Sequence, residues 1–276
     1  MLSGAYALGA SLSWGVGDFL GGLKSRLMPA LSVIALSQPF GLVVLAVAVA
    51  VRGTAPPGGD VWWACLSAVL GTSGLFAFYR GMASGAMSVV VPIASIAAAF
   101  PVAWGLASGD KVSAVQELGF VAAIGGSALA SVERHERRTR LAAGVGWAVL
   151  AMVAFGGYYI PMHAASQQDW LWPSFLFRCT SVTLVWSIVL ARRATPHGFR
   201  LHLPALAAIG LLDTGGNVLF AAASMSGLLS VVAVLASLYP VVTVLLARIT
   251  LGERVQLSQD IGIVATLAGV VMISAG

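Results

Sequence analysis

Charged residues are scarce in this chain of 276 residues, and their scarcity excludes a water-soluble fold. Only 9% of the residues are Asp, Glu, Lys or Arg, whereas 59% are hydrophobic. Soluble domains contain roughly 25% charged residues. A surface with so few charges could not face water, so the composition predicts an integral membrane protein. Its 32 glycines agree, because small residues let helices approach closely in lipid.

Cysteine, histidine and the motifs of common enzymes are also limited. The two cysteines, Cys65 and Cys179, fall in separate apolar stretches, where we interpret them as small core residues. The four histidines lie in or near expected loops without an HExxH or CxxC arrangement, so we predict no metal site. The ATP-binding pattern GxxxxGK[ST] is missing, and we predict no cofactor. The net charge of +5 does not indicate nucleic acid, because the cations gather at the ends of apolar stretches.

Long apolar stretches fill most of the chain. A transmembrane helix needs roughly 20 mostly apolar residues, and no basic segment marks the first stretch as a cleaved signal peptide. The sequence therefore predicts an all-α, multi-pass protein of the plasma (inner) membrane, in contact with membrane lipids. Hydropathy predicts ten transmembrane helices, at 3–22, 31–51, 61–82, 86–107, 114–131, 142–162, 172–191, 203–223, 227–247 and 257–275.

The second half of the chain repeats the first. The segment Gly109–Ser131 aligns with Gly252–Ser274 at a constant offset of 143, with eight of 23 positions identical. One residue of slippage extends the match upstream to the pairs Gly85/Gly227, Ser88/Ser230 and Ser95/Ser237.

Each half contains five spans, and this odd number fixes the relation between the halves. Two copies of one unit with an odd number of spans must lie upside down relative to each other in the bilayer. The sequence therefore predicts two inverted five-helix repeats, residues 1–132 and 142–276, joined by a charged linker at 133–141. Many secondary transporters have this architecture, with the substrate site between the repeats.

Several motifs resemble EamA-type members of the drug/metabolite transporter superfamily. Span one reads LSWGVGDFLGGLKSR, span four begins with GAMSVVVPIAS, and the halves end in GDKVSAVQELG and GERVQLSQDIG. The resemblance covers nearly the whole chain and implies outward transport of a small metabolite, such as an amino acid or another polar compound. It also implies a cavity surrounded by spans 1, 3, 4, 6, 8 and 9, with the fifth and tenth helices packed together away from it. The first repeat departs from the pattern, with GDK in place of the more usual GER.

Two indications of orientation disagree. Twelve Lys and Arg residues gather on one side of the predicted bundle, and only Arg52 and Lys111 lie on the other. Because cytoplasmic loops are enriched in Lys and Arg, this count places both termini outside. The family resemblance implies cytoplasmic termini, so both orientations stay open, as does the oligomeric state.

Asp213, Asn217 and Arg178 are the leading candidates for a substrate or coupling site. Charges inside a membrane usually face a cavity, because burying one in lipid costs about 3 kcal/mol or more. Asp213 and Asn217 are four residues apart, so they share a helix face. Asp213 could carry a coupling proton or bind an ammonium group, and Arg178 could bind a carboxylate. Alternatively, Asp213 and Arg178 form a structural ion pair.

Span one and span six supply the other candidates. Asp18 follows Trp14 by one turn, so the two could line a cavity mouth with Trp14 as a cation–π wall. Alternatively, Asp18 pairs with Lys24 or Arg26 at the interface. Tyr158 in span six could face the interior or belong to an interfacial aromatic belt.

Two other functional classes compete with transport. A passive channel or a non-transporting membrane protein would not depend on Asp213. An intramembrane aspartyl protease is suggested by the GxGD string that ends at Asp18, with Asp213 as a second acid. The order of the acids and the repeat argue against the protease, so the sequence favours a secondary transporter, which is not an enzyme.

Overall fold

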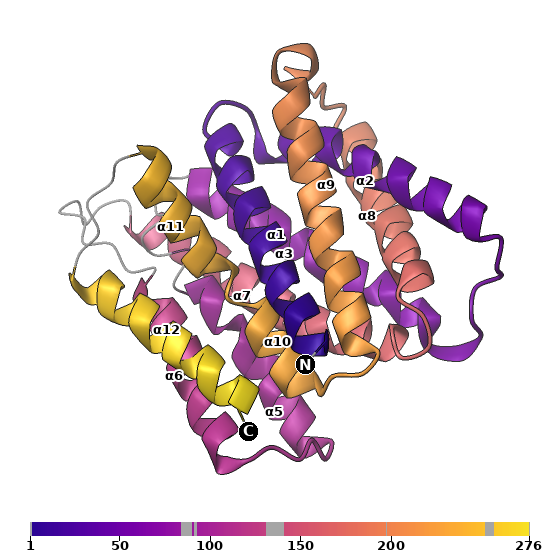
Figure 1. The fold of residues 1–276 in the computed structure, drawn as a ribbon. Helices are drawn as coiled ribbons and strands as arrows, with labels where there is room; N and C mark the ends of the chain where they lie inside the picture. Colours follow the sequence, from indigo (N-terminus) through magenta and orange to yellow (C-terminus); the bar gives the residue numbers. More distant parts are fainter. Residues whose placement is uncertain are drawn as a thin grey trace.

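A computed structural model describes residues 2–83, 90, 93–130, 141–196, 198–251 and 257–275. The linker at 133–140 lies outside these residues, as do Gly85, Ser88 and the turn at 252–256. The described part is a bundle of helices without strands (Figure 1). Its α-helices are α1 (Leu2–Ser25), α2 (Ala30–Arg52), α3 (Trp63–Ala83), α5 (Ala99–Ala107), α6 (Ala114–Ala130), α7 (Leu141–Ala165), α8 (Leu171–Ala191), α9 (Phe199–Ser224), α10 (Leu229–Ala236), α11 (Tyr239–Leu251) and α12 (Leu257–Ala275).

Apolar helices account for the ten predicted spans. Five described helices are long and apolar enough to cross a membrane, namely Ala30–Arg52, Gly59–Ala83, Gly146–Ala165, Leu171–Ala191 and Phe199–Ser224. Four shorter apolar segments lie at Ile93–Ala107, Ala114–Leu129, Leu229–Thr243 and Asp260–Ile273. The tenth helix is α1, which has 24 residues but is not among the five apolar ones. It packs against α3, α9, α10 and α11, so it is surrounded by protein on several sides.

One predicted span is broken in the middle. The segment 227–247 was expected to be a single helix, but α10 ends at Ala236 and α11 begins at Tyr239. Pro240, the second residue of α11, has no N–H to continue the helix from α10. In span four, a short 3-10 segment, Ile96–Ala98, precedes α5. Pro161, by contrast, lies inside the continuous helix α7.

A polar contact between two helix ends joins α2 to α8. The Asp169 carboxylate accepts a hydrogen bond from the Leu171 N–H at 2.6 Å, at the start of α8. The same carboxylate lies 2.8 Å from the guanidinium of Arg52, the last residue of α2. The end of α2 and the start of α8 therefore lie on the same face of the bundle.

The last helices of the two halves, α6 and α12, pack through small residues. A β-carbon at Gly126 would lie 2.8 Å from the Gly262 carbonyl oxygen, and one at Gly119 would lie 3.0 Å from that of Gly269. The two helices are therefore antiparallel, and their backbones touch. Lipid provides no hydrophobic drive for helix association, so this close van der Waals contact holds the pair together. The packing expected for the fifth and tenth helices is confirmed.

We predict that Gly126→Ala destabilises the protein by about 1–3 kcal/mol, because the added methyl group overpacks backbone atoms of α12. The adjacent Gly125 is a matched control, since a β-carbon there meets nothing within 4 Å. Thermal unfolding of the purified protein in detergent measures both effects. Equal melting temperatures for the Gly126→Ala and Gly125→Ala variants would contradict the close crossing.

Candidate functional site

A cavity lies inside the bundle, lined by residues from both halves of the chain. Its aromatic walls are Trp14, Phe155, Tyr158, Tyr159, Phe177 and Tyr239. Its polar lining residues are Asp18, Gln38, Thr72, Asp213 and Asn217.

The cavity differs in part from the one that the resemblance implied. Spans 1, 3, 6, 8 and 9 contribute lining residues as expected. Spans 2 and 7 also contribute, through Gln38 and Phe177, and these two spans were missed. Within the described part of span four, no residue lines the cavity.

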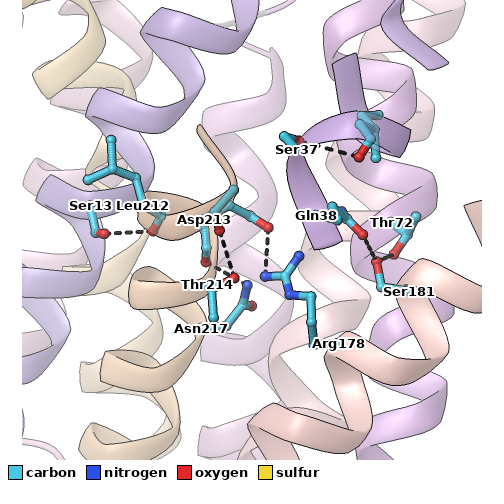
Figure 2. A network of polar contacts seen from close by, with 12 residues as sticks. Ser13, Ser37, Gln38, Thr72, Arg178, Ser181, Leu212, Asp213, Thr214 and Asn217 are labelled. Atoms are coloured by element: carbon cyan, nitrogen blue, oxygen red, sulfur yellow. Dashed lines mark hydrogen bonds and ion pairs between the residues drawn. The ribbon is translucent and has the colours of Figure 1, made fainter. Parts of the chain in front are cut away.

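An ion pair joins α8 to α9 beside the cavity (Figure 2). Arg178 Nη2 lies 2.8 Å from Asp213 Oδ2. The Arg178 side chain has no exposed surface, and that of Asp213 is 18% exposed. Asp213 lines the cavity and Arg178 does not. Asp213 and Arg178 therefore form the ion pair that was one of the two alternatives predicted from the sequence.

Asn217 and Tyr158 extend this polar group. The Asn217 side-chain amide donates to the Asp213 carbonyl oxygen at 2.8 Å, one helical turn away. The Tyr158 hydroxyl donates to Asn217 Oδ1 at 2.7 Å. Tyr158 is only 4% exposed, so it faces the interior and not the membrane interface. The three residues connect α7 to α9 along one wall of the cavity.

Asp18 also lines the cavity, but without a cation. Its side chain is hydrogen-bonded to the Tyr79 hydroxyl, which approaches α1 closely at Gly21. In the described part of the chain, no ion pair involves Asp18. Lys24 instead lies 3.4 Å from His202 Nδ1. The alternative in which Asp18 forms an ion pair with Lys24 is therefore wrong. An ion pair between Asp18 and Arg26 is likewise not among the described ion pairs.

Trp14 packs in the centre of an aromatic cluster. Its ring centroid lies 5.9 Å from that of Tyr158 and 6.1 Å from that of Phe220. Gly216 on α9 makes room for the indole, since a β-carbon there would overlap it. The indole of Trp14 therefore packs against α9 at Gly216, and Trp14 lines the cavity.

A second polar network lies on the α2–α8 side of the cavity (Figure 2). The hydroxyl oxygens of Thr72 and Ser181 lie 2.6 Å apart, and the Ser181 hydroxyl donates to Gln38 Oε1. All three side chains are buried. The sequence reasoning missed this network, although the repeat held a signal, since Thr72 aligns with Thr214 beside Asp213 at an offset of 142.

The break in span nine places a tyrosine in the cavity wall. Tyr239 is the first residue of α11 and lines the cavity at 4% exposure. Its hydroxyl is buried and has no hydrogen-bond partner among the described residues. Such orphaned groups are rare in folded proteins. The wall of the cavity thus contains a tyrosine whose hydrogen-bonding capacity is unused within the described residues.

Five of the six predicted site residues line this one cavity, namely Trp14, Asp18, Tyr158, Asp213 and Asn217. The sixth, Arg178, lies behind Asp213. In the described part of the chain, no cluster of His, Cys, Asp and Glu has the arrangement of a metal site.

Comparison with known proteins identifies the family. Residues 142–275 match the model of the EamA-like transporter family. The chain belongs to this family. It is part of the drug/metabolite transporter superfamily, so the resemblance seen in the sequence is confirmed. EamA-like proteins are transporters and not enzymes. Together with this family membership, the long apolar helices of this chain identify it as an integral, multi-pass membrane protein.

Solved structures share the fold of this EamA-like chain. One of them, a crystal structure of a protein without a stated function, matches with a TM-score of 0.76 and 15% identity. The match covers 99% of this chain and 96% of the other. At this identity the likeness concerns the fold alone. No curated protein matches the chain.

We predict that Asp213→Asn destabilises the protein by about 3–5 kcal/mol, because it leaves the buried Arg178 charge without a partner. Arg178→Met costs less, because the Asp213 side chain is 18% exposed and lines the cavity, where water can solvate it. The double variant regains most of the loss, since replacing a buried ion pair with neutral groups is often close to neutral. Melting temperatures of the two single variants and the double variant in detergent measure this double-mutant cycle. If the shifts of the two single variants simply add in the double variant, Asp213 and Arg178 are not coupled.

Proposed function

We propose that this EamA-like protein is a secondary transporter that moves a small polar metabolite outward across the plasma membrane by alternating access. Its two halves, residues 1–132 and 142–276, rock as inverted repeats around the cavity. Trp14, Asp18, Tyr158, Asp213 and Asn217 contact the substrate, and Arg178 holds Asp213 in place. The observation that carries this proposal is that equivalent residues of the two halves make equivalent contacts.

The first pair of equivalent contacts joins a glycine to an aromatic ring. Gly216 packs on Trp14, and Gly74 packs on Phe155. Gly74 and Gly216 are 142 positions apart, and Trp14 and Phe155 are 141 positions apart. Each half therefore lays the aromatic residue of its first helix on the third helix of the other half, as expected of two related units with a common axis.

The second pair involves the break in span nine and the 3-10 segment Ile96–Ala98 in span four. A β-carbon at Gly15 would lie 2.8 Å from the Tyr239 carbonyl oxygen, and one at Gly156 would lie 2.9 Å from that of Ala97. Gly15 and Gly156 are 141 positions apart, and Ala97 and Tyr239 are 142 apart. Discontinuous helices in equivalent positions of two repeats are typical of transporter substrate sites.

The cavity lining follows the same correspondence. Eight lining residues form four equivalent pairs, at offsets of 141 or 142, namely Trp14/Phe155, Asp18/Tyr159, Gly71/Asp213 and Leu75/Asn217. The antiparallel crossing of α6 and α12 and the start of the family match at residue 142 also support two inverted halves. A cavity on the axis between such halves can be exposed to either side in turn.

Counterflow in liposomes tests transport. We expect saturable uptake of a candidate solute that falls at least about tenfold in Asp18→Asn, because a buried charge in a transporter cavity usually acts on the cargo. Asp60→Asn, at an exposed acid outside the cavity, is the matched control and retains uptake. Flux without saturation and without dependence on Asp18 or Asp213 would indicate a passive channel, and absence of flux across a broad panel of solutes would indicate a non-transporting protein.

Cysteine labelling tests orientation, for which we propose that the face rich in Lys and Arg is cytoplasmic. Gly58 follows α2, and Ala194 follows α8, which begins beside the end of α2. The two exposed positions therefore lie on opposite faces. In a variant without Cys65 and Cys179, an impermeant thiol reagent should label Gly58→Cys in intact cells and Ala194→Cys only after permeabilisation. The reverse pattern would place both termini in the cytoplasm.

A further inference from the structure

The charges around the cavity do not balance. Two carboxylates, Asp18 and Asp213, line it. Arg178 neutralises Asp213 at 2.8 Å, whereas no ion pair involves Asp18 in the described part of the chain. The cavity therefore contains one unmatched carboxylate, and a buried carboxylate without a partner is unfavourable. A cation that enters the cavity would supply the missing partner.

Asp18 and Tyr239 are two polar residues that line the same cavity. The Asp18 residue is 8% exposed and lines the cavity. Tyr79 donates a hydrogen bond to its carboxylate, which fixes the side chain without neutralising it. Tyr239, a residue 4% exposed, lines the same cavity, and its buried hydroxyl has no partner among the described residues. A ligand with hydrogen-bond donors or a hydroxyl group would complete both groups.

The aromatic walls suit the same kind of ligand. Six aromatic side chains line the cavity, among them Trp14, one turn before Asp18. The faces of Trp and Tyr rings attract organic cations, and such attraction is strongest where water is excluded.

A substrate carboxylate, by contrast, finds no Lys or Arg among the described residues that line the cavity. The Arg178 guanidinium does not line the cavity, lies 5.6 Å from the Phe177 ring and is already paired with Asp213. In the described lining, an anion therefore meets no compensating positive charge, and neither does the carboxylate of a zwitterion.

We propose that the substrate of this cavity is a small organic cation, a primary or quaternary amine, bound between the Asp18 carboxylate and the aromatic walls. The assignment of this ligand as cargo rests on the proposed transport function. The binding site itself does not, so the two can fail separately.

Equilibrium binding to the purified full-length protein in uncharged detergent tests the cation site. Choline is compared with its neutral isostere 3,3-dimethylbutan-1-ol, and 2-phenylethylamine is compared with 2-phenylethanol and with phenylalanine. We expect at least one of the two cations to bind at least about tenfold more tightly than its neutral counterpart, and 2-phenylethylamine to bind more tightly than phenylalanine. Asp18→Asn should abolish this preference, and Asp60→Asn should leave it unchanged.

Each outcome decides the proposal. Equal binding of cation and neutral isostere in both pairs, tighter binding of phenylalanine than of 2-phenylethylamine, or absence of binding by both cations would overturn it. If Asp18→Asn does not fold, the preference of the wild-type protein still decides, and Asp18→Glu should retain it. Cation binding without flux in liposomes would contradict transport and leave the site intact. Flux of neutral or anionic solutes without cation binding would contradict the site and leave transport intact.

Discussion

The ion pair between Arg178 and Asp213 is the interaction on which the cavity depends. A guanidinium stays charged in proteins, and Arg178 has no exposed surface, so it requires an acid in contact. Asp213 meets this requirement and brings α8 against α9. Through Asn217 the same wall is hydrogen-bonded to Tyr158 on α7, and Tyr158 packs against Trp14 on α1. The ion pair and these contacts together join four helices around the cavity. Arg178 also neutralises Asp213, so that a ligand in the cavity meets it as part of an ion pair and not as a free charge.

Glycine provides the second constraint, because helices in lipid associate through close packing. Several glycines lie where a side chain or backbone of the other half fills the space of a β-carbon, as at Gly216 against Trp14 and Gly126 against Gly262. Gly125, next to Gly126, has no such neighbour. The abundance of glycine in the composition therefore reflects specific contacts between the halves at some positions, and only low side-chain volume at others.

Much of the fold could be predicted from the sequence, because apolar length and the internal repeat report directly on membrane spans. The break between Ala236 and Tyr239 could not, since span nine is uniformly apolar and Pro240 alone does not distinguish a kink from an interruption. For the site, rarity of charge was a sufficient guide to Asp18, Arg178 and Asp213. It gave no guide to Gln38, Thr72 or Tyr239, whose uncharged side chains are common in membrane helices and become informative only through their neighbours.

Comparison of the two halves explains why the unmatched charge lies where it does. On the shared framework, Asp18 takes the place equivalent to Tyr159, and Asp213 takes the place equivalent to Gly71. Asp213 is neutralised by Arg178, which belongs to the same half of the chain. The acid of the first half has no arginine beside it among the described ion pairs and receives only a hydroxyl from Tyr79. Two related halves can therefore share one packing scheme while the cavity between them carries an ion-paired acid from one half and an acid without a paired cation from the other, among the described ion pairs.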